Sequence, residues 1–252
     1  MDQTLLFVLV IAAVLAILTA AFFADKKRRE AMAGLAQKLN LQFVPSGIAL
    51  GNAPNTSIFS YGDPPDPAPD GVEFVDSFPL FNKGRSRRIE PLIVGTDEFG
   101  TEWFLFDYKY HVKLRRRAYY ARRFTVVVVK TKSHMPALSL MKKGIKASGS
   151  KLFGQEHIKV DSAAFDHRYF IKTPSKKMAT EVLHPMAIEV LLGQPNFEWH
   201  MAGPYVMIFQ SGKKKIEALE EIRACIAAFI DQIPDEYHQE YAVGKKLRLM
   251  PL

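Results

Sequence analysis

An uninterrupted apolar run near the N-terminus constrains this chain more than any other feature of its sequence. Residues 5–24 read LLFVLVIAAVLAILTAAFFA, with no charge, proline or glycine and a single hydroxyl at Thr19. A helix of twenty residues spans roughly 30 Å, the thickness of the hydrocarbon core of a bilayer. Thirteen of the twenty are Leu, Ile, Val or Phe, and each favours insertion by about 0.3–0.6 kcal/mol. The run predicts a transmembrane helix.

A cleaved signal peptide and a buried core helix are the two competing interpretations of this run. A signal peptide carries positive charge before a shorter apolar stretch. Here the leader has only Asp2, and the positive charge follows the run as Lys26, Lys27, Arg28 and Arg29. We therefore expect a retained single-pass anchor in the plasma (cytoplasmic) membrane. Because basic flanks stay in the cytoplasm, the N-terminus should lie outside and the rest of the chain inside.

Over all 252 residues the composition is that of an ordinary globular protein, with 48% hydrophobic and 24% charged residues. A wholly disordered chain is excluded. The net charge of +8 makes contact with an anionic surface plausible. A lone Cys225 excludes an intramolecular disulfide and a cysteine-based zinc cluster, and it fits a reducing compartment.

Composition divides the part after the anchor into four segments. We expect residues 25–45 to form a basic juxtamembrane helix, because Met32, Leu35, Ala36 and Leu39 stand at helical spacing. Residues 46–71 form a loop rich in proline, glycine and aspartate. Residues 72–234 form a soluble α+β domain, and residues 235–252 form a polar, peripheral tail. Whether the domain divides into subdomains 72–145 and 155–234 stays open.

Strand patterns dominate the first half of the predicted domain. Residues 87–96 and 102–112 flank a turn at 97–100 and predict an antiparallel hairpin. Period-two alternation places Phe104, Phe106, Tyr108 and Tyr110 on one face of the second arm. Pro91 lacks an amide donor and argues for an edge or a bulge. Residues 124–130 (FTVVVVK) are typical of a strand buried on both faces.

The second half mixes strands and helices. We expect a strand at 165–173, a helix from Ser175 to Gly193 that is interrupted at Pro185, and a hairpin of 197–201 with 205–210. Residues 213–233 carry an apolar stripe and predict an amphipathic helix docked on a sheet. The fold class is therefore α+β: a transmembrane helix followed by a mainly antiparallel sheet with amphipathic helices packed on it.

Several of these segments together resemble a family of bacterial proteins of unknown function. The matching pieces are residues 29–45 (REAMAGLAQKLNLQFVP), 78–85 (FPLFNKGR), 93–95 (IVG), 103–110 (WFLFDYKY), the valine strand, 135–140 (MPALSL), and Phe165 with Tyr169 and Ile171. The resemblance implies one N-terminal membrane helix and a soluble α+β domain. It assigns no activity and no catalytic residue.

Motifs that carry chemistry are missing from the sequence. None of the seven histidines stands at a metal-ligand spacing, and neither a glycine-rich phosphate loop nor a GxSxG elbow occurs. Cys225 falls within the amphipathic helix and is expected to be a small buried residue. Asp166, His167 and Arg168 are read as a solvated strand face, because neighbouring strand residues point to opposite sides. We predict no catalytic residue, cofactor or metal site, and a non-enzymatic protein.

A basic cluster is the sequence feature that points most clearly to a function. Between Lys83 and Lys132 there are thirteen Lys or Arg against five Asp or Glu. The cluster centres on residues 113–123 (KLRRRAYYARR), which we expect to form a loop between two strands. One interpretation is a solvated hairpin tip. The other is contact with anionic phospholipid head groups of the inner leaflet, where each basic residue contributes about 1 kcal/mol and tyrosine suits the interface.

The predicted lipid-contact residues come from the two basic segments: Lys26, Lys27, Arg28, Arg29, Lys113, Arg115, Arg116, Arg117, Tyr119, Tyr120, Arg122 and Arg123. The function predicted from them is a membrane-anchored scaffold or accessory module that lies against an anionic bilayer. An unidentified membrane or cytoplasmic protein is a further expected partner. Nucleic-acid binding by the same arginines is the alternative, although the anchor counts against it. An enzyme with an unrecognised site is the third class.

Overall fold

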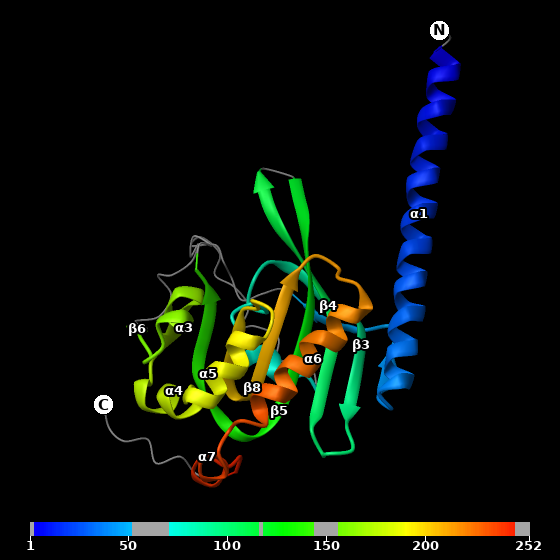
Figure 1. The fold of residues 1–252 in the computed structure, drawn as a ribbon. Coiled ribbons are helices and arrows are strands. Elements are labelled where there is room, and N and C mark those ends of the chain that lie inside the picture. The colour runs from blue at the N-terminus through cyan, green and yellow to red at the C-terminus, as the bar shows by residue number, and fades with distance from the viewer. Residues whose placement is uncertain (1–2, 52–70, 116–117, 144–155, 245–252) are drawn as a thin grey trace.

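The computed structural model describes residues 3–51, 71–115, 118–143 and 156–244, and within them the chain is an α+β protein (Figure 1). One long N-terminal helix is followed by a mainly antiparallel sheet with helices. Helix α1 runs without a break from Gln3 to Lys38. Its N-terminal part is long and apolar enough to cross a membrane, and none of that stretch is buried. This exposure contradicts the core-helix interpretation and agrees with a single-pass anchor.

The described strands form one eight-stranded sheet in which β5 is the longest member. The order is β1-β3-β4-β5-β7-β6, with β2 also paired to β3 and β8 to β5, and every pairing is antiparallel. The strand bounds are β1 Gln42–Val44, β2 Ile48–Gly51, β3 Arg85–Thr96, β4 Glu102–Arg115, β5 Ala118–Lys142, β6 Glu156–Ile158, β7 Tyr169–Thr173 and β8 Trp199–Ser211.

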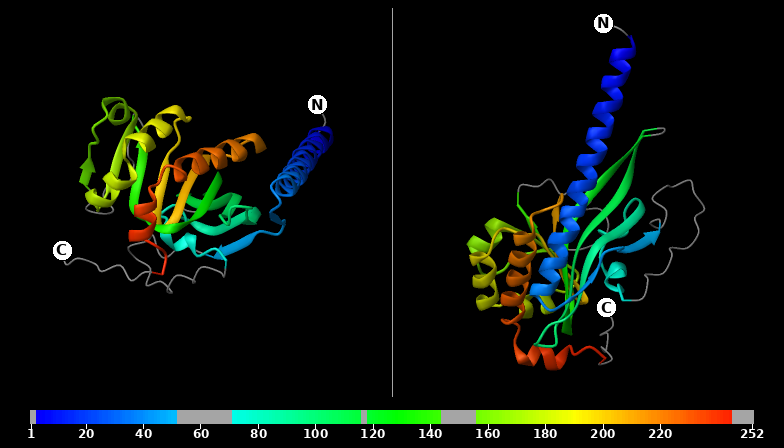
Figure 2. Two further views of the ribbon diagram at one scale, coloured as in Figure 1. Left: turned by 60° about the horizontal axis from the view of Figure 1, so that its bottom comes forward. Right: turned by 90° about the vertical axis from the view of Figure 1, so that its right-hand side faces the viewer.

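Most of the helices cover one face of this sheet, as Figure 2 shows for α4, α5 and α6. Their bounds, with those of the shorter helices, are α2 Phe74–Ser77, α3 Ala163–Arg168, α4 Lys176–Val182, α5 Pro185–Gly193, α6 Ile216–Ile230 and α7 Asp235–Glu240. The core under the helices draws residues from α1 through to Tyr241. A second, aromatic core lies on the opposite face under α2. Because the helix-side core joins residues from both halves, it is not divided at residue 145.

The sheet confirms the main sequence predictions. Strands β3 and β4 form the predicted hairpin, closed by the bond from Gly100 N–H to the Asp97 carbonyl at 3.0 Å. Val126 to Val129 are all fully buried between the two cores. The β3–β4 register shifts between Ile89 and Leu92, which places the predicted bulge at Pro91. The amphipathic helix is α6, with Leu219, Ile222, Ile226 and Phe229 buried on one stripe.

Helix α1 ends earlier than predicted. The sequence pattern extended the juxtamembrane helix to Pro45, but Asn40 adopts a positive φ of 53° directly after the helix end. Residues 42–44 then form β1 and pair with 92–94 of β3. Strand β2 likewise occupies part of the segment predicted as loop 46–71. Pairing with β3 therefore determines the conformation of residues 42–44, where the helical spacing of apolar residues is weak.

Three predictions for the second half were wrong. Residues 163–168 form α3, because Ser162 Oγ caps the helix by accepting from Phe165 N–H, and the strand begins only at Tyr169. The expected 197–210 hairpin is one strand, β8, in which Gly203 (φ 56°) marks a register shift opposite Met135. In the described part of the tail, residues 235–240 form α7, whose Tyr237 is buried and donates from its hydroxyl to the His134 carbonyl at 2.8 Å. Residues 245–252 lie outside the described residues.

Candidate membrane-facing site

The C-terminal half of α1 packs against the sheet rather than standing apart from it. Met32, Leu35 and Ala36 are buried in the helix-side core, and Leu39 packs at its margin. These residues recur at the spacing of one helix face, as predicted. The helix that carries the apolar segment is therefore continuous with a helix that belongs to the folded domain.

An ion pair between Arg28 and Asp107 fixes this docking one turn before the apolar stripe. Arg28 Nε donates to Asp107 Oδ2 at 2.9 Å and Nη2 donates to Oδ1 at 2.8 Å. The side chains are only 10% and 4% exposed. The two-pronged geometry matches the planar guanidinium to the carboxylate. Asp107 lies in the middle of β4, so this pair joins α1 directly to a central strand of the sheet.

The remaining polar groups around the pair are satisfied as well. Arg28 Nη1 donates to the carbonyl of Lys214 at 2.7 Å. The Thr125 hydroxyl lies 3.3 Å from Asp107 Oδ1 and accepts from Lys214 N–H at 2.9 Å. Charges that are taken out of water are tolerated when their hydrogen-bonding capacity is filled in this way. The segment between β8 and α6 is thereby held to both α1 and β5.

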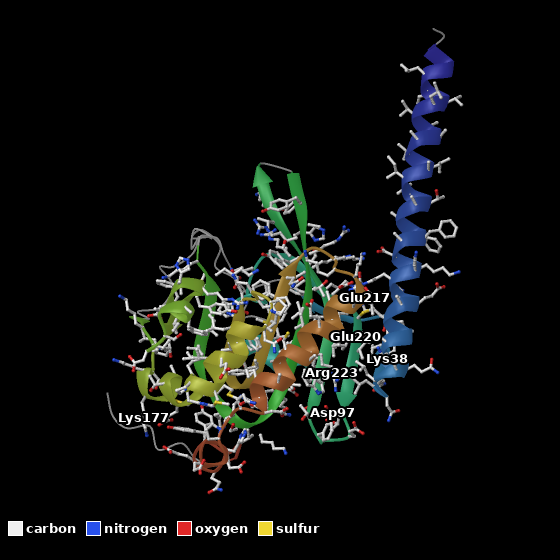
Figure 3. The ribbon with its side chains drawn as sticks, viewed as in Figure 1. Lys38, Asp97, Lys177, Glu217, Glu220 and Arg223 are labelled. Atoms are coloured by element: carbon white, nitrogen blue, oxygen red, sulfur yellow. The ribbon has the colours of Figure 1, made fainter. Side chains whose placement is uncertain are left out.

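Two exposed ion pairs flank this buried one along the same helix. Lys213 Nζ lies 2.6 Å from Asp25 Oδ1. Lys38 Nζ lies 2.8 Å from Glu220 Oε1, and Figure 3 labels these two residues. Because both pairs face solvent, each contributes at most about 1 kcal/mol. The buried pair and the apolar stripe therefore dominate the docking.

A second anchor fixes α6 to the turn between β3 and β4. Arg223 Nη2 donates to Asp97 Oδ2 at 3.1 Å, and Figure 3 labels these two residues. Trp103 Nε1 donates to the same oxygen at 2.8 Å. The Arg223 guanidinium also lies over the Trp103 ring, 4.8 Å from its centre. Burial opposes ionisation of Asp97, but the bonds from Thr101 N–H, Trp103 and Phe99 N–H outweigh it and hold its pKa below the usual value.

The basic cluster lies on the distal arms of the β4–β5 hairpin. Residues 113–123 were predicted as a loop, but the strands continue until Arg115 pairs with Ala118. Figures 1 and 2 show this hairpin projecting on the same side of the molecule as the N-terminal part of α1. Lys113, Arg122 and Arg123 are exposed on it. The fold thus brings the second basic segment to the side from which the apolar helix extends.

Two tyrosines lie beside these cations on the hairpin, and tyrosine is common at membrane interfaces. Tyr119 is 48% exposed. Arg122 Nε donates to the Tyr120 hydroxyl at 3.1 Å, and the Arg122 guanidinium lies 5.6 Å from the centre of the same ring. The bond to Tyr120 raises the pKa of Arg122 above its usual value. An arrangement of exposed cations beside amphipathic rings suits a head-group layer.

The predicted lipid-contact residues fall into three groups. Arg28 is corrected: it is bound to Asp107 inside the protein, so it is not a contact for lipid. Lys26, Lys27, Arg29, Lys113, Tyr119, Arg122 and Arg123 are exposed, and Tyr120 is partly so. Arg116 and Arg117 lie outside the described residues, as does the side chain of Arg115. Sequence reasoning missed Asp107, although a carboxylate inside the apolar run of β4 was the available signal.

Neither of the sequence candidates for chemistry forms an acid–base site. Arg168 donates to the carbonyls of Leu192 and Gln194 at the end of α5. Asp166 Oδ1 accepts from Val160 N–H at 3.3 Å in the preceding loop. Both side chains therefore hydrogen-bond to the backbone of neighbouring segments. Cys225 is buried, as predicted, and donates from Sγ to Gln194 Oε1 at 2.8 Å. Burial raises its thiol pKa to about 11, which keeps it neutral.

A serine–histidine contact that the sequence did not indicate lies beside a mostly apolar pocket. His200 Nδ1 is 3.0 Å from Ser139 Oγ, and burial, followed by the charge of Lys83, lowers the pKa of His200 to about 4. The pocket measures about 470 Å³ and is lined by Phe78, Leu138 and Met201 among others. Within the described residues, His200 Nε2 has no hydrogen-bond partner to orient the ring. A nucleophile–base–orienter set is therefore not assembled there.

Comparison with known proteins gives one remote structural likeness to report. No protein-family model matches the chain, and no curated protein matches it. The crystal structure of the mycobacterial trehalose monomycolate transport factor A, TtfA, is similar with a TM-score of 0.48 and 9% sequence identity, over 81% of this chain and 92% of that one. The family resemblance stays a prediction.

The buried ion pair predicts a large stability difference between two matched substitutions. Asp107→Asn leaves the Arg28 guanidinium buried without its counter-charge, and we expect a loss of about 3 kcal/mol in the free energy of unfolding. Glu220→Gln, the same chemical change at the exposed partner of Lys38, should cost at most about 1 kcal/mol. Urea unfolding of the full chain in an uncharged detergent measures both.

The double variant Arg28→Met with Asp107→Leu is the control for this prediction. Because it removes both charges and keeps apolar volume, it should recover most of the loss seen for Asp107→Asn. A double variant as unstable as the single one, or equal losses for Asp107→Asn and Glu220→Gln, would contradict the assignment.

Proposed function

We propose that this protein is a membrane-anchored, non-enzymatic accessory module whose β4–β5 hairpin contacts anionic lipid head groups. The observation that carries the proposal is the direction of the hairpin: it projects on the same side of the molecule as the apolar part of α1 (Figure 2). A helix inserted in a bilayer then brings the exposed Lys113, Arg122 and Arg123 toward the surface of that bilayer.

The physical support is electrostatic attraction within a tethered geometry. Each basic side chain near an anionic leaflet contributes about 1 kcal/mol, and this attraction falls off within a Debye length of about 8–10 Å. Tethering through α1 raises the effective concentration of the surface, so weak individual contacts are sufficient. The docking of α1 through Arg28 and Asp107 keeps the hairpin from pointing elsewhere.

The proposed orientation places the N-terminus outside and the α+β domain in the cytoplasm. Its support is the exposed basic group of Lys26, Lys27 and Arg29, which follows the apolar run directly. Lys and Arg flanks are retained on the cytoplasmic side of a membrane helix. The same side carries the anionic leaflet that the hairpin requires.

Binding to vesicles tests the lipid contact. A fragment from Asp25 onward keeps Arg28 and the apolar stripe of α1, and we expect it to bind vesicles containing phosphatidylserine but not vesicles of phosphatidylcholine alone. Replacing Lys113, Arg122 and Arg123 by Gln should weaken this binding about 100-fold, because three contributions of about 1 kcal/mol are lost. Co-sedimentation at 0.15 M salt measures the binding.

Matched charge removal elsewhere provides the control for vesicle binding. Lys132, Lys176 and Lys177 are exposed and lie outside the hairpin arms, with Lys177 on α4 as Figure 3 shows. Replacing these three by Gln removes the same charge and should leave binding within about threefold of the parent. Equal losses for the two triple variants, or equal binding to both kinds of vesicle, would refute the proposal. Circular dichroism checks that each fragment is folded.

Reporter fusions test the orientation separately. A fluorescent protein fused after Leu252 should be bright, and alkaline phosphatase at the same point should be inactive, because the first matures in the cytoplasm and the second requires oxidised disulfides. An active phosphatase fusion would place the domain outside and would overturn the proposed contact with the inner leaflet.

A further inference from the structure

We infer that an open pocket at the side of the β4–β5 hairpin binds a phosphate monoester group. The pocket has a volume of about 520 Å³ and is walled by the hairpin on one side and by the turn at residues 83–85 on the other. Four cationic side chains line it: Lys83, Arg85, Lys113 and Arg122. The inference deepens the proposed function and rests on it only for the source of the ligand, a membrane lipid.

A glycine allows the two walls to approach each other. Gly84 has a φ of 76°, and a Cβ added there would lie 2.4 Å from Tyr110 Cδ2 and 2.6 Å from the His111 carbonyl oxygen. Both separations are too short for any side chain. Arg85 then begins β3 opposite His111 of β4. The backbone therefore holds Lys83 and Arg85 against the hairpin arms. Residues 111–122 of these arms lie more than 25 residues further along the sequence.

The charge inside the pocket is not compensated by the described part of the protein. None of the described residues that line the pocket carries a carboxylate. Glu90, an acidic residue of β3, is already paired with Arg88 at 3.0 Å and Lys109 at 3.1 Å. Lys83, Arg85 and Lys113 form no ion pair with any described residue. Like charges gathered at one site repel each other, and a bound anion relieves that repulsion.

The donor geometry favours phosphate over a carboxylate or a singly charged anion. Guanidinium groups present parallel N–H donors that match the oxygens of a phosphate, and lysine adds compact point charges. Arg122 is pre-oriented because its Nε donates to the Tyr120 hydroxyl, which leaves its terminal nitrogens for a ligand. Tyr119 and Tyr120 form the remaining rim. A monoester carries about two negative charges near neutral pH, which suits four cations better than the single charge of a diester.

Calorimetric titration of the full chain in an uncharged detergent at 0.15 M salt tests this inference. The probes are glycerol 3-phosphate and dioctanoyl phosphatidic acid, which share a phosphate monoester, and dioctanoyl phosphatidylglycerol, which has a diester. We expect binding of at least one monoester, at least tenfold tighter than that of the diester. If phosphatidic acid binds tenfold more tightly than glycerol 3-phosphate, the ligand is a lipid. If the two bind equally, the ligand is a soluble phosphate ester. Either result supports the pocket.

Variants outside the hairpin separate this inference from the proposed function. Arg85→Gln and, independently, Lys83→Gln should weaken monoester binding at least tenfold, whereas Lys132→Gln should leave it unchanged. Three results would overturn the pocket: neither monoester binds, the diester binds equally well, or both variants keep the parent affinity. None of these results bears on vesicle binding through Lys113, Arg122 and Arg123, which the co-sedimentation assay tests. Monoester binding by a protein that ignores anionic vesicles would overturn the proposed function alone.

Discussion

The buried ion pair between Arg28 and Asp107 is the constraint on which the rest of the structure depends. Removing two charges from water costs several kcal/mol each, and their attraction repays this only when the geometry is good and every remaining group is bonded. Here the Lys214 carbonyl and the Thr125 hydroxyl complete the set. Such a pair adds little net stability over apolar packing, but any docking that separates its members is strongly disfavoured. It therefore selects one position for α1 on the sheet.

That one position sets the direction in which the apolar part of α1 leaves the folded domain. Because α1 is continuous from Gln3 to Lys38, the direction of its docked half determines the direction of its apolar half. Strand β4 carries Asp107 near its middle and the basic hairpin arm at its end. Asp107, which binds α1, and Lys113, which is proposed to touch lipid, thus lie on the same strand, and Arg122 and Arg123 lie on the neighbouring strand β5. We propose that the tyrosines and the pocket at Gly84 add chemical selectivity to this surface, because charge alone does not distinguish one anion from another.

Much of the fold could be read from local patterns, and most of the site could not. Period-two alternation in residues 102–112 and the valines at 126–129 predicted β4 and β5, because those side chains face buried layers. The 29–45 pattern failed at its end, where pairing with β3 turned residues 42–44 into a strand. Arg28 belongs to a basic run that predicts lipid contact. Its actual partner, Asp107, lies 79 residues away in the sequence, so no local pattern indicates the ion pair. Long-range pairs, and the approach of residues 83–85 to the hairpin, have no local signature.

The depth of the hairpin relative to a bilayer tests the central claim most directly. In a Cys225→Ala background, Tyr119→Cys labels the hairpin and Phe99→Cys labels the β3–β4 turn at the other end of β4, where Phe99 is 75% exposed. A fluorophore on each cysteine is measured in the full chain, reconstituted in anionic bilayers whose head groups carry a quencher. We predict strong quenching at residue 119 and little at residue 99. Equal quenching at both positions, or none at residue 119, would contradict a hairpin held against the membrane by the docked helix.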